Sequence, residues 1–290
     1  MPVYQQNVPQ NVAPKVTIVG VGLIGGSIGL ALGQRGLAKQ IVGVGRRQQS
    51  LDRALACGAI GSATVDLAAG VAAADVVIVA TPVESVVEDV CRALAAAPAG
   101  VLVTDVGSTK TNICEAVADN EVDSCGFVGS HPLAGDHRSG PEHARGDLFD
   151  GKTVVVTPTK ATLPETTERA EVFWKSLGAQ VVQMPPEQHD RALATTSHLP
   201  HLVASALAAS TPPEWLPLAA TGWADTTRIA AADPKLWTQI FAQNTPSVIA
   251  ALDCLIEQLQ AARSNLVADE STQIEKFLHQ AKRTRDALGN

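Results

Sequence analysis

The sequence predicts an α/β domain followed by an all-helical domain, and three features of the chain indicate this. Short runs rich in β-branched residues alternate with helical patterns from residue 15 to about residue 185. The first run ends in closely spaced glycines and passes into a helical pattern over 28–34. Beyond 186, strand candidates disappear and long alanine- and leucine-rich stretches take over. We therefore expect a tail over 1–14, a doubly wound, mostly parallel sheet over 15–185, and a helical domain over 186–290.

The glycines follow the first apolar run with the spacing Gly20-x-Gly22-x-x-Gly25. In the order strand, glycines, helix, this spacing is typical of Rossmann-type dinucleotide-binding domains. The first glycine permits a tight turn, the second lets the backbone approach a pyrophosphate, and the third allows the helix to pack closely on the strand. Leu23 and Ile24 lie at the helix start, where N–H groups face the phosphates. The alternative is a glycine-rich turn that binds no ligand.

The end of the second expected strand, at 41–44, bears on which dinucleotide binds. An NAD-selective site places an acidic residue about 20 residues past the glycines, where it accepts the ribose hydroxyls. Here Gly45 has that place, and Arg46 and Arg47 follow it. A guanidinium binds a 2′-phosphate bidentately, so the sequence favours NADP, with NAD as the other candidate. Alternatively, both arginines are solvated loop charges or stack on adenine, and Asp52 is a weaker candidate for a ribose contact.

Composition and charge argue against several classes of partner. The chain has 290 residues, enough for two domains with cores of their own, and 46% of them are hydrophobic. Its formal net charge is -7 and aromatic residues make up 3%, which argues against nucleic acid and anionic membranes as partners. The N-terminal stretch is polar, and no run approaches the roughly 20 apolar residues of a membrane span. Five cysteines without metal-ligand spacing predict reduced thiols, no metal and a cytoplasmic location.

Ligands of such a sheet bind where its parallel strands end. Thr81 and Pro82 end one expected strand, Ser108 follows the next, and His131 directly follows another. Thr81, Pro82 and Ser108 are therefore candidates for cofactor contacts. The strands after the second are expected at 75–82, 101–106, 127–130, 153–157 and 180–183.

His131 is the candidate proton acceptor, because imidazole titrates near neutral pH and this histidine lies at the cofactor edge of the sheet. The alternative is a structural histidine whose hydrogen bonds are satisfied within the fold. Ser108 is expected either to cap the helix that follows it or to donate its hydroxyl to the substrate or the catalytic group. Lys110 is expected to bind an anion or to lie at the surface.

A third cluster lies in the helical region. His198 and His201 are three residues apart, so on a helix they share one side, and Ser197 precedes them. A zinc pair there lacks a third ligand at sensible spacing. Further on, Arg228 stands among small and apolar residues, where an arginine needs a carboxylate partner, either Asp225 or a ligand.

Five motifs in this order and spacing resemble those of the prephenate and arogenate dehydrogenases of tyrosine biosynthesis. They are the glycine fingerprint and the segments 105–110, 131–135, 197–201 and 225–230. The resemblance extends from residue 15 to the C-terminus. It implies hydride transfer from C4 of prephenate or arogenate to NAD(P), loss of CO2, and a homodimer formed by the helical domain.

The resemblance also implies a role for each matching residue. His131 corresponds to the histidine that accepts the proton of the ring hydroxyl, and Ser108 to the serine that hydrogen-bonds with both groups. Arg228 corresponds to the arginine that binds a substrate carboxylate. His201 corresponds to a histidine that lines the substrate pocket near the substrate side chain, and Ser197 and His198 lie beside it in the sequence.

Two positions depart from the family pattern. Many members carry Lys or Arg where this chain has Ala224, so one basic contact is missing. Asp136 is acidic where some relatives have a neutral residue, and a carboxylate there would pair with the ammonium of arogenate and repel prephenate. This favours arogenate as substrate, unless Asp136 pairs with Arg138 instead.

Two other functions are compatible with a Rossmann-type domain joined to helices. A β-hydroxyacid dehydrogenase would need a lysine on the first long helix after the sheet, and no lysine lies between Lys175 and Lys235. A non-catalytic dinucleotide-binding protein would have no need of Ser108, His131 and Arg228 together.

Overall fold

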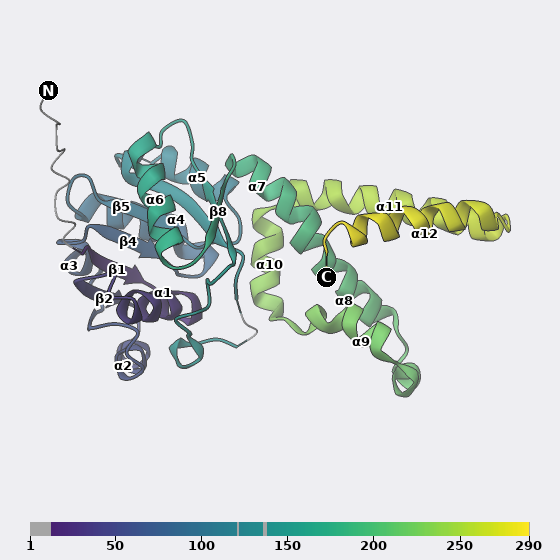
Figure 1. Ribbon diagram of the computed structural model, residues 1–290, viewed down its shortest axis with the longest axis horizontal. Coiled ribbons are helices and arrows are strands. Elements are labelled where there is room, and N and C mark those ends of the chain that lie inside the picture. Colours follow the sequence, from purple (N-terminus) through teal and green to yellow (C-terminus); the bar gives the residue numbers. More distant parts are fainter. Residues whose placement is uncertain (1–12, 121, 136–137, 290) are drawn as a thin grey trace, which may run out of the picture. The chain divides into compact units, whose positions relative to one another are not determined.

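The computed structural model describes residues 13–120, 122–135 and 138–289. The chain divides into two compact units (Figure 1). The first unit comprises Met1–Asp190 and Ala232–Gln243, and the second comprises Arg191–Ala231 and Asn244–Asn290. The sequence placed every residue after 185 in the helical domain, whereas 186–190 and 232–243 group with the first unit. Most of the expected tail, up to residue 12, lies outside the described residues.

An eight-stranded sheet forms the centre of the first unit, in the order β3-β2-β1-β4-β5-β6-β7-β8. Strands β1 to β6 are parallel, β7 runs antiparallel to β6, and β8 is parallel to β7. The strand order reverses between β1 and β4, as at the switch point of a doubly wound fold. The strands are β1 (Lys15–Val19), β2 (Gln40–Val44), β3 (Ser62–Thr64), β4 (Val76–Val79), β5 (Leu102–Asp105), β6 (Phe127–Pro132), β7 (Thr153–Thr157) and β8 (Gln180–Gln183).

Helices cover both faces of this sheet (Figure 1). One core receives side chains from α1 (Leu23–Gln34), α2 (Gln48–Ala56) and α6 (Pro164–Ser176). The other receives side chains from α3 (Leu67–Val71), α4 (Val83–Ala96) and α5 (Thr111–Ala118). Helix α10 (Pro234–Gln243) packs on α4, where the Gln239 amide donates to the Glu84 carboxylate at 2.8 Å.

The sequence of β4 explains why the strand is buried on both faces. It reads Val-Val-Ile-Val, and all four side chains are buried. Successive side chains of a strand point to opposite faces. Ile78 accordingly lies in the same core as Ile28 of α1 and Trp174 of α6, while Val77 lies in the other core with Val86 of α4. Burial of each such apolar side chain contributes about 1.5–3 kcal/mol, so the β-branched run stabilises both helical layers.

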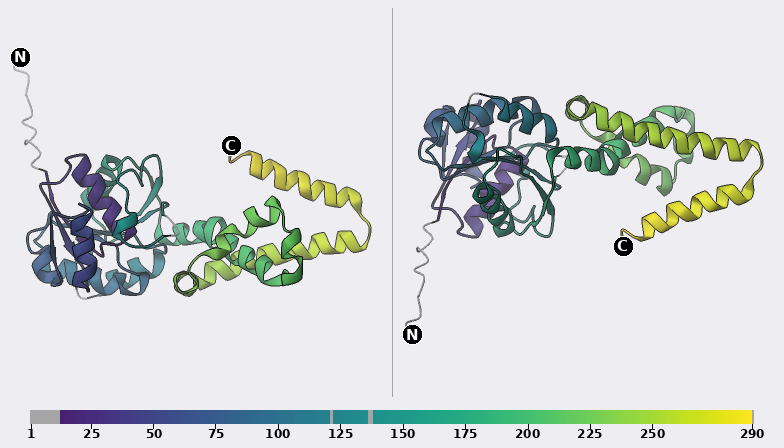
Figure 2. Two further views of the ribbon diagram at one scale, coloured as in Figure 1. Left: turned by 90° about the horizontal axis from the view of Figure 1, so that it is seen from below. Right: turned by 90° about the horizontal axis from the view of Figure 1, so that it is seen from above.

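The second unit is wholly helical where it is described. Helix α7 (Pro186–Leu193) leads into one π-helical stretch over 194–198 and then α8 (Leu199–Ser210). Short helical elements follow: α9 (Thr221–Thr227) and a 3₁₀ turn over Arg228–Ala231. The unit ends in α11 (Thr245–Val267) and α12 (Ser271–Asp286), which diverge after a turn in which Asp269 has φ 53° (Figure 2). No residue of α12 is buried within the chain.

The predicted fold class is confirmed: a mostly parallel, doubly wound sheet is followed by a helical region. Two details differ from the expectation. β3 was not expected, because its three residues contain no apolar run, and it is placed by its pairing with β2. His131 lies within β6, opposite Val155 of β7, and not after the strand. None of the described helices is long and apolar enough to cross a membrane.

Candidate active site

The glycine loop after β1 leaves an open, positively polarised space at the start of α1. Gly20 has φ 91°, and a Cβ there would lie 2.6 Å from the Ala80 carbonyl oxygen. A Cβ at Gly25 would overlap the Gly20 carbonyl. At Gly22, by contrast, no described atom lies within 4 Å of a Cβ, and no side chain caps the helix. The first N–H groups of α1, from Leu23 onward, and the helix dipole thus present a cradle that fits a pyrophosphate.

Two buried hydroxyls at the same edge of the sheet support the presence of a ligand site. Thr81 follows β4 and Thr109 follows β5, and neither hydroxyl has a hydrogen-bond partner among the described residues. A buried hydroxyl without a partner costs about 1–3 kcal/mol, which a bound polar ligand would recover. Because Gly20 packs against Ala80 and Thr81, the structure brings Thr81 beside the glycine loop, with Pro82 exposed next to it.

The loop after β2 carries the residues expected to select the dinucleotide. Gly45 lies against Leu51, whose side chain would be 3.2 Å from a Cβ there. Arg46 and Arg47 are both exposed. The carboxylate of Asp52 accepts a hydrogen bond from Gln48 of its own helix at 2.9 Å. The loop therefore presents two cations and no carboxylate at the position where an NAD-selective site has an acidic residue.

A buried ion pair fixes the loop after β5. Lys110 and Asp105 are both fully buried, and the ammonium is hydrogen-bonded to the Asp105 carboxylate. The Lys110 ammonium also donates to the Ser130 carbonyl at 2.9 Å, while Asp105 accepts from the Ser130 N–H at 3.1 Å and the Gly107 N–H at 2.8 Å. Lys110 was expected to lie at the surface or to bind an anionic ligand, and this expectation is wrong. Its buried ammonium instead pairs with Asp105 of β5 and donates to the Ser130 carbonyl of β6.

Ser108 lies half-buried inside this braced loop. It does not cap the following helix, because α5 has Lys110 at its N-cap position. The Asp190 carboxylate performs the capping, since it accepts the Lys110 N–H at 2.8 Å and the Thr111 N–H at 2.9 Å. Capping of α5 by Ser108 is therefore excluded, and its role as a hydrogen-bonding group for the substrate or the catalytic group stays a prediction.

His131 begins a chain of hydrogen bonds that runs into the protein. Its Nδ1 lies 2.9 Å from Nε2 of His189, and the two rings meet edge to face with centroids 5.1 Å apart. Nδ1 of His189 lies 2.8 Å from the Asp190 carboxylate. His131 is half-buried, whereas His189 and Asp190 are 0% and 2% exposed. Sequence reasoning missed His189 and Asp190, because His131, the partner of His189, is 58 residues away in the chain.

The charge states of this region follow from its contacts. Burial raises the pKa of Asp190, but hydrogen bonds from His189, Thr111 and Lys110 outweigh it and hold that pKa below its usual value. Burial also raises the pKa of the Cys114 thiol to about 12, against the lowering effect of Lys110. Asp190 is therefore an anion at neutral pH, and Cys114 is a neutral thiol that cannot serve as a nucleophile.

The second unit brings two of the predicted residues together. The pKa of His201 is lowered, mainly by burial and further by the positive charge of Arg228, while a hydrogen bond with the Ile229 backbone acts in the opposite direction. Arg228 is exposed at the start of its 3₁₀ turn, and no ion pair joins it to Asp225 within the described residues. His201 and Arg228 therefore form a cationic, hydrogen-bonding surface suited to a carboxylate.

The remaining candidates have different surroundings. His198 is 1% exposed, and its Nδ1 accepts a hydrogen bond from the Asn244 amide at 3.2 Å. Ser197 is half-buried in the π-helical stretch, and such stretches occur frequently at functional sites. Asp136, the residue on which a preference for arogenate was based, lies outside the described residues.

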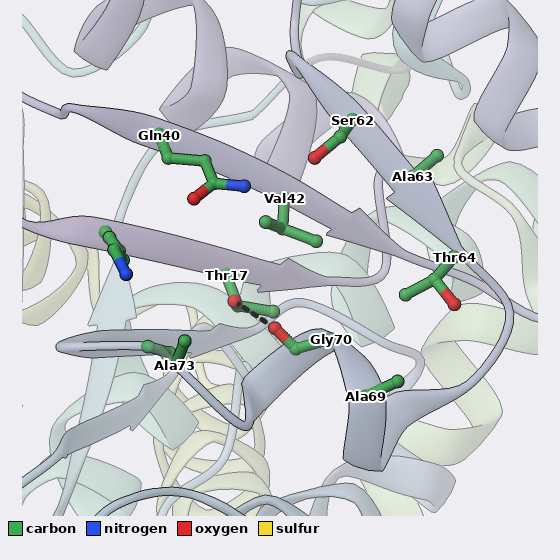
Figure 3. A pocket seen from close by; sticks show the side chains of 11 residues that line it. Thr17, Gln40, Val42, Ser62, Ala63, Thr64, Ala69, Gly70 and Ala73 are labelled. Carbon is green, nitrogen blue, oxygen red and sulfur yellow. Dashed lines mark hydrogen bonds between the residues drawn. The ribbon is translucent and has the colours of Figure 1, made fainter.

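A separate cavity of about 260 Å³ lies on the first unit beside α3 (Figure 3). Its walls include Thr17, Val42 and Thr64, and the Thr17 hydroxyl donates to the Gly70 carbonyl at 2.7 Å. Lys15 and Gln40, the first residues of β1 and β2, also line it. The cavity thus extends to the amino ends of the strands, away from the glycine loop, and it contains none of the predicted site residues.

Comparisons with known proteins agree with the motif resemblance. Residues 28–183 match the family model for the prephenate dehydrogenase nucleotide-binding domain, and residues 185–282 match the model for the prephenate dehydrogenase dimerization domain. The prephenate dehydrogenase of Bacillus subtilis is 34% identical over 168 residues, which are 56% of this chain and 45% of that protein. The cyclohexadienyl dehydrogenase of Zymomonas mobilis is 31% identical over 171 residues, 56% of this chain and 58% of that protein. The chain spans about half the length of the curated relatives it matches.

Solved structures extend the likeness over nearly the whole chain. The prephenate dehydrogenase of Aquifex aeolicus, in complex with hydroxyphenyl propionate and NAD+, has a TM-score of 0.89 and 30% identity, covering 97% of this chain and 100% of that one. Synechocystis arogenate dehydrogenase has a TM-score of 0.83 and 28% identity, covering 94% and 99%. With matching models on both parts of its length, the chain belongs to the prephenate dehydrogenase family.

Proposed function

We propose that this protein oxidises prephenate, arogenate or both, with loss of CO2 and transfer of a hydride to a nicotinamide dinucleotide. The observation that carries the proposal is the position of His131. It lies at the edge of the sheet that also presents the glycine loop, and its Nδ1 is bonded into the His189–Asp190 pair. With Nδ1 engaged by His189, we assign the acceptance of a proton from a substrate hydroxyl to Nε2. Membership of the prephenate dehydrogenase family supports the choice of substrate.

The proposed chemistry needs proton transfer and charge binding from the protein. A bound nicotinamide dinucleotide would supply the acceptor for the hydride that leaves C4 of the ring. His131 takes the proton of the C4 hydroxyl as the carbonyl forms, and Ser108 hydrogen-bonds with that oxygen. Breakage of the bond to the ring carboxylate releases CO2 and makes the ring aromatic, after which the proton returns from His131 to the ring oxygen. Arg228, with His201 beside it, supplies a cation for a substrate carboxylate.

For the dinucleotide, we propose a preference for NADP. Gly45 removes the carboxylate that would repel a 2′-phosphate, and the exposed Arg46 and Arg47 offer cations to bind it. The Aquifex aeolicus relative was solved with NAD+, so the loop after β2 is the place where the two proteins are expected to differ in function.

We also propose that the protein is a homodimer in the cytoplasm. The match to a dimerization domain supports the dimer, as do exposed apolar side chains along α11 and α12, including Ile249, Leu259 and Leu278. All five cysteines are free thiols, which supports a reducing compartment.

A kinetic comparison tests the proposed reaction. Purified protein is mixed with prephenate or arogenate and with NAD or NADP, and the near-ultraviolet absorbance of the reduced nicotinamide is followed. We expect reduction with at least one substrate and a higher kcat/KM with NADP than with NAD. Absence of reduction in all four mixtures would overturn the proposed function, and a higher kcat/KM with NAD would overturn the cofactor preference.

A further inference from the structure

His189 and Asp190 are buried polar groups that the reaction itself does not use. They are adjacent residues in the middle of α7. Together with His131 of β6 they form one line of hydrogen bonds, from His131 Nδ1 to His189 at 2.9 Å and from His189 to Asp190 at 2.8 Å. His189 is fully buried, so water does not compete for either ring nitrogen. Such a line of hydrogen bonds determines which nitrogen of the His131 ring carries the hydrogen.

The carboxylate at the inner end of the line is held in place. One oxygen of Asp190 accepts from His189 and from the Lys110 N–H at 2.8 Å, and the other accepts from the Thr111 N–H at 2.9 Å. Both N–H groups belong to the start of α5, where the helix dipole favours an anion. These donors keep the pKa of Asp190 low, so the carboxylate is ionised and acts only as an acceptor.

The protonation of both rings follows from that anion. Because Asp190 only accepts, Nδ1 of His189 carries a hydrogen and donates it. A neutral His189 then has its lone pair on Nε2, which accepts a hydrogen bond from Nδ1 of His131. The lone pair of His131 is thereby placed on Nε2. The other arrangement, with His189 doubly protonated, would put a charged ring at a site of 0% exposure and leave the hydrogen of His131 on Nε2.

We infer that His189 and Asp190 are positioning residues that hold His131 in the Nδ1–H form and steady its ring after it has accepted a proton at Nε2. The inference rests on the proposed function, in which His131 is the proton acceptor. When His131 becomes positive, its Nδ1–H bond to His189 strengthens and the Asp190 anion compensates the charge along the line. The fixed loop after β5, with the buried Lys110–Asp105 pair, holds the start of α5 and hence Asp190.

A pair of substitutions at one position tests the inference. His189→Leu removes both hydrogen bonds, and we expect kcat to fall on the order of 10²-fold with KM changed less than about threefold, because only proton acceptance is impaired. His189→Gln retains an acceptor for His131 and a donor for Asp190, so we expect it to recover at least about tenfold of that loss. Glu168→Leu, at an exposed position of α6 outside the proposed dimer helices, is the control for introducing a leucine and should behave as the unaltered protein.

A measurement on the unaltered protein tests the same inference without a variant. Nitrogen-15 NMR of the histidine rings distinguishes N–H from lone-pair nitrogens, and His131→Asn identifies the signals of His131. We expect Nδ1 of His131 to be protonated and Nε2 to be unprotonated near neutral pH. In His189→Leu, this single form should give way to a mixture of the two.

The outcomes separate this inference from the proposed function. Protonated Nε2 in the unaltered protein, or His189→Leu with kcat within about threefold of normal, would overturn the positioning role. If His189→Leu does not fold, the NMR result on the unaltered protein decides. If the protein reduces neither dinucleotide with either substrate but shows the Nδ1–H form, the proposed function fails while the assigned protonation stands.

Discussion

The proposed proton-acceptor site of the first unit and the cationic surface of the second unit are built in opposite ways. Behind His131, the side chains of Lys110, Asp105 and His189 are all 0% exposed. Lys110 and Asp105 are hydrogen-bonded to each other, and His189 is hydrogen-bonded to His131 and Asp190. Arg228 is exposed. A proton acceptor must present one particular nitrogen in one direction, whereas a carboxylate can be attracted by a cation that still contacts water. The preorganised side chains thus lie beside the residue that we propose as the proton acceptor.

Breaking the buried ion pair should have the largest effect on stability. Lys110→Met removes the ammonium and leaves the Asp105 carboxylate buried without its cation, so we expect the free energy of unfolding to fall by about 3–5 kcal/mol. Denaturant unfolding at constant pH measures this. Asp105→Asn combined with Lys110→Met removes the unpaired charge and should recover part of the loss. A loss below about 1 kcal/mol for Lys110→Met would show that the pair does not brace the loop.

His131→Asn should have the largest effect on turnover. The amide cannot accept a proton, so we expect kcat to fall by about 10²–10⁴-fold while KM stays nearly constant. Steady-state kinetics with saturating dinucleotide measures both constants. An unchanged kcat would show that His131 is not the proton acceptor. The difference in burial between the groups behind His131 and Arg228 would then be unrelated to catalysis.

The parts of the fold that sequence reasoning predicted are those with a local pattern. The run Val76–Val79 is β-branched throughout, and the glycines follow β1 with a fixed spacing, so both were found without any knowledge of distant residues. The family resemblance, based on motifs in order, is confirmed by the matches to residues 28–183 and 185–282. Patterns within about ten residues were therefore enough to predict the α/β class and the position of the glycine loop.

The features that sequence reasoning missed depend on contacts between distant residues. Lys110 is charged and was expected near water, but its burial depends on Asp105 and on the Ser130 carbonyl of the neighbouring strand. His189 acquires its role from His131, on another element. β3 has no apolar run of its own, and it forms by parallel pairing with the edge of β2. Local periodicity contains no information about such partners, so hydrogen-bond networks between elements had to come from the structure.

Arg228→Ala tests the exposed side of the contrast. Because the guanidinium is solvated, its loss should change the free energy of unfolding by no more than about 0.5 kcal/mol. We expect KM for the substrate to rise by about 10- to 100-fold, as for loss of a hydrogen bond to a charged group, with kcat little changed. Kinetics and denaturant unfolding on the same preparation measure both. A change confined to kcat would contradict carboxylate binding by Arg228.

The loop after β2 extends the contrast to the dinucleotide, since Arg46 and Arg47 are exposed cations like Arg228. Gly45→Asp places a carboxylate where it would accept ribose hydroxyls and repel a 2′-phosphate. The new Cβ would lie 3.2 Å from Leu51, whose flexible side chain can move by a few tenths of an ångström. We expect the ratio of kcat/KM for NADP to that for NAD to fall by about tenfold, with kcat on the better dinucleotide unchanged.

Arg46→Ala and Arg47→Ala are the companion variants. We expect them to weaken the binding of NADP and to leave the binding of NAD unchanged. If Gly45→Asp leaves the ratio unchanged, this loop does not contact the ribose, and solvated cations then contribute to substrate binding only at Arg228.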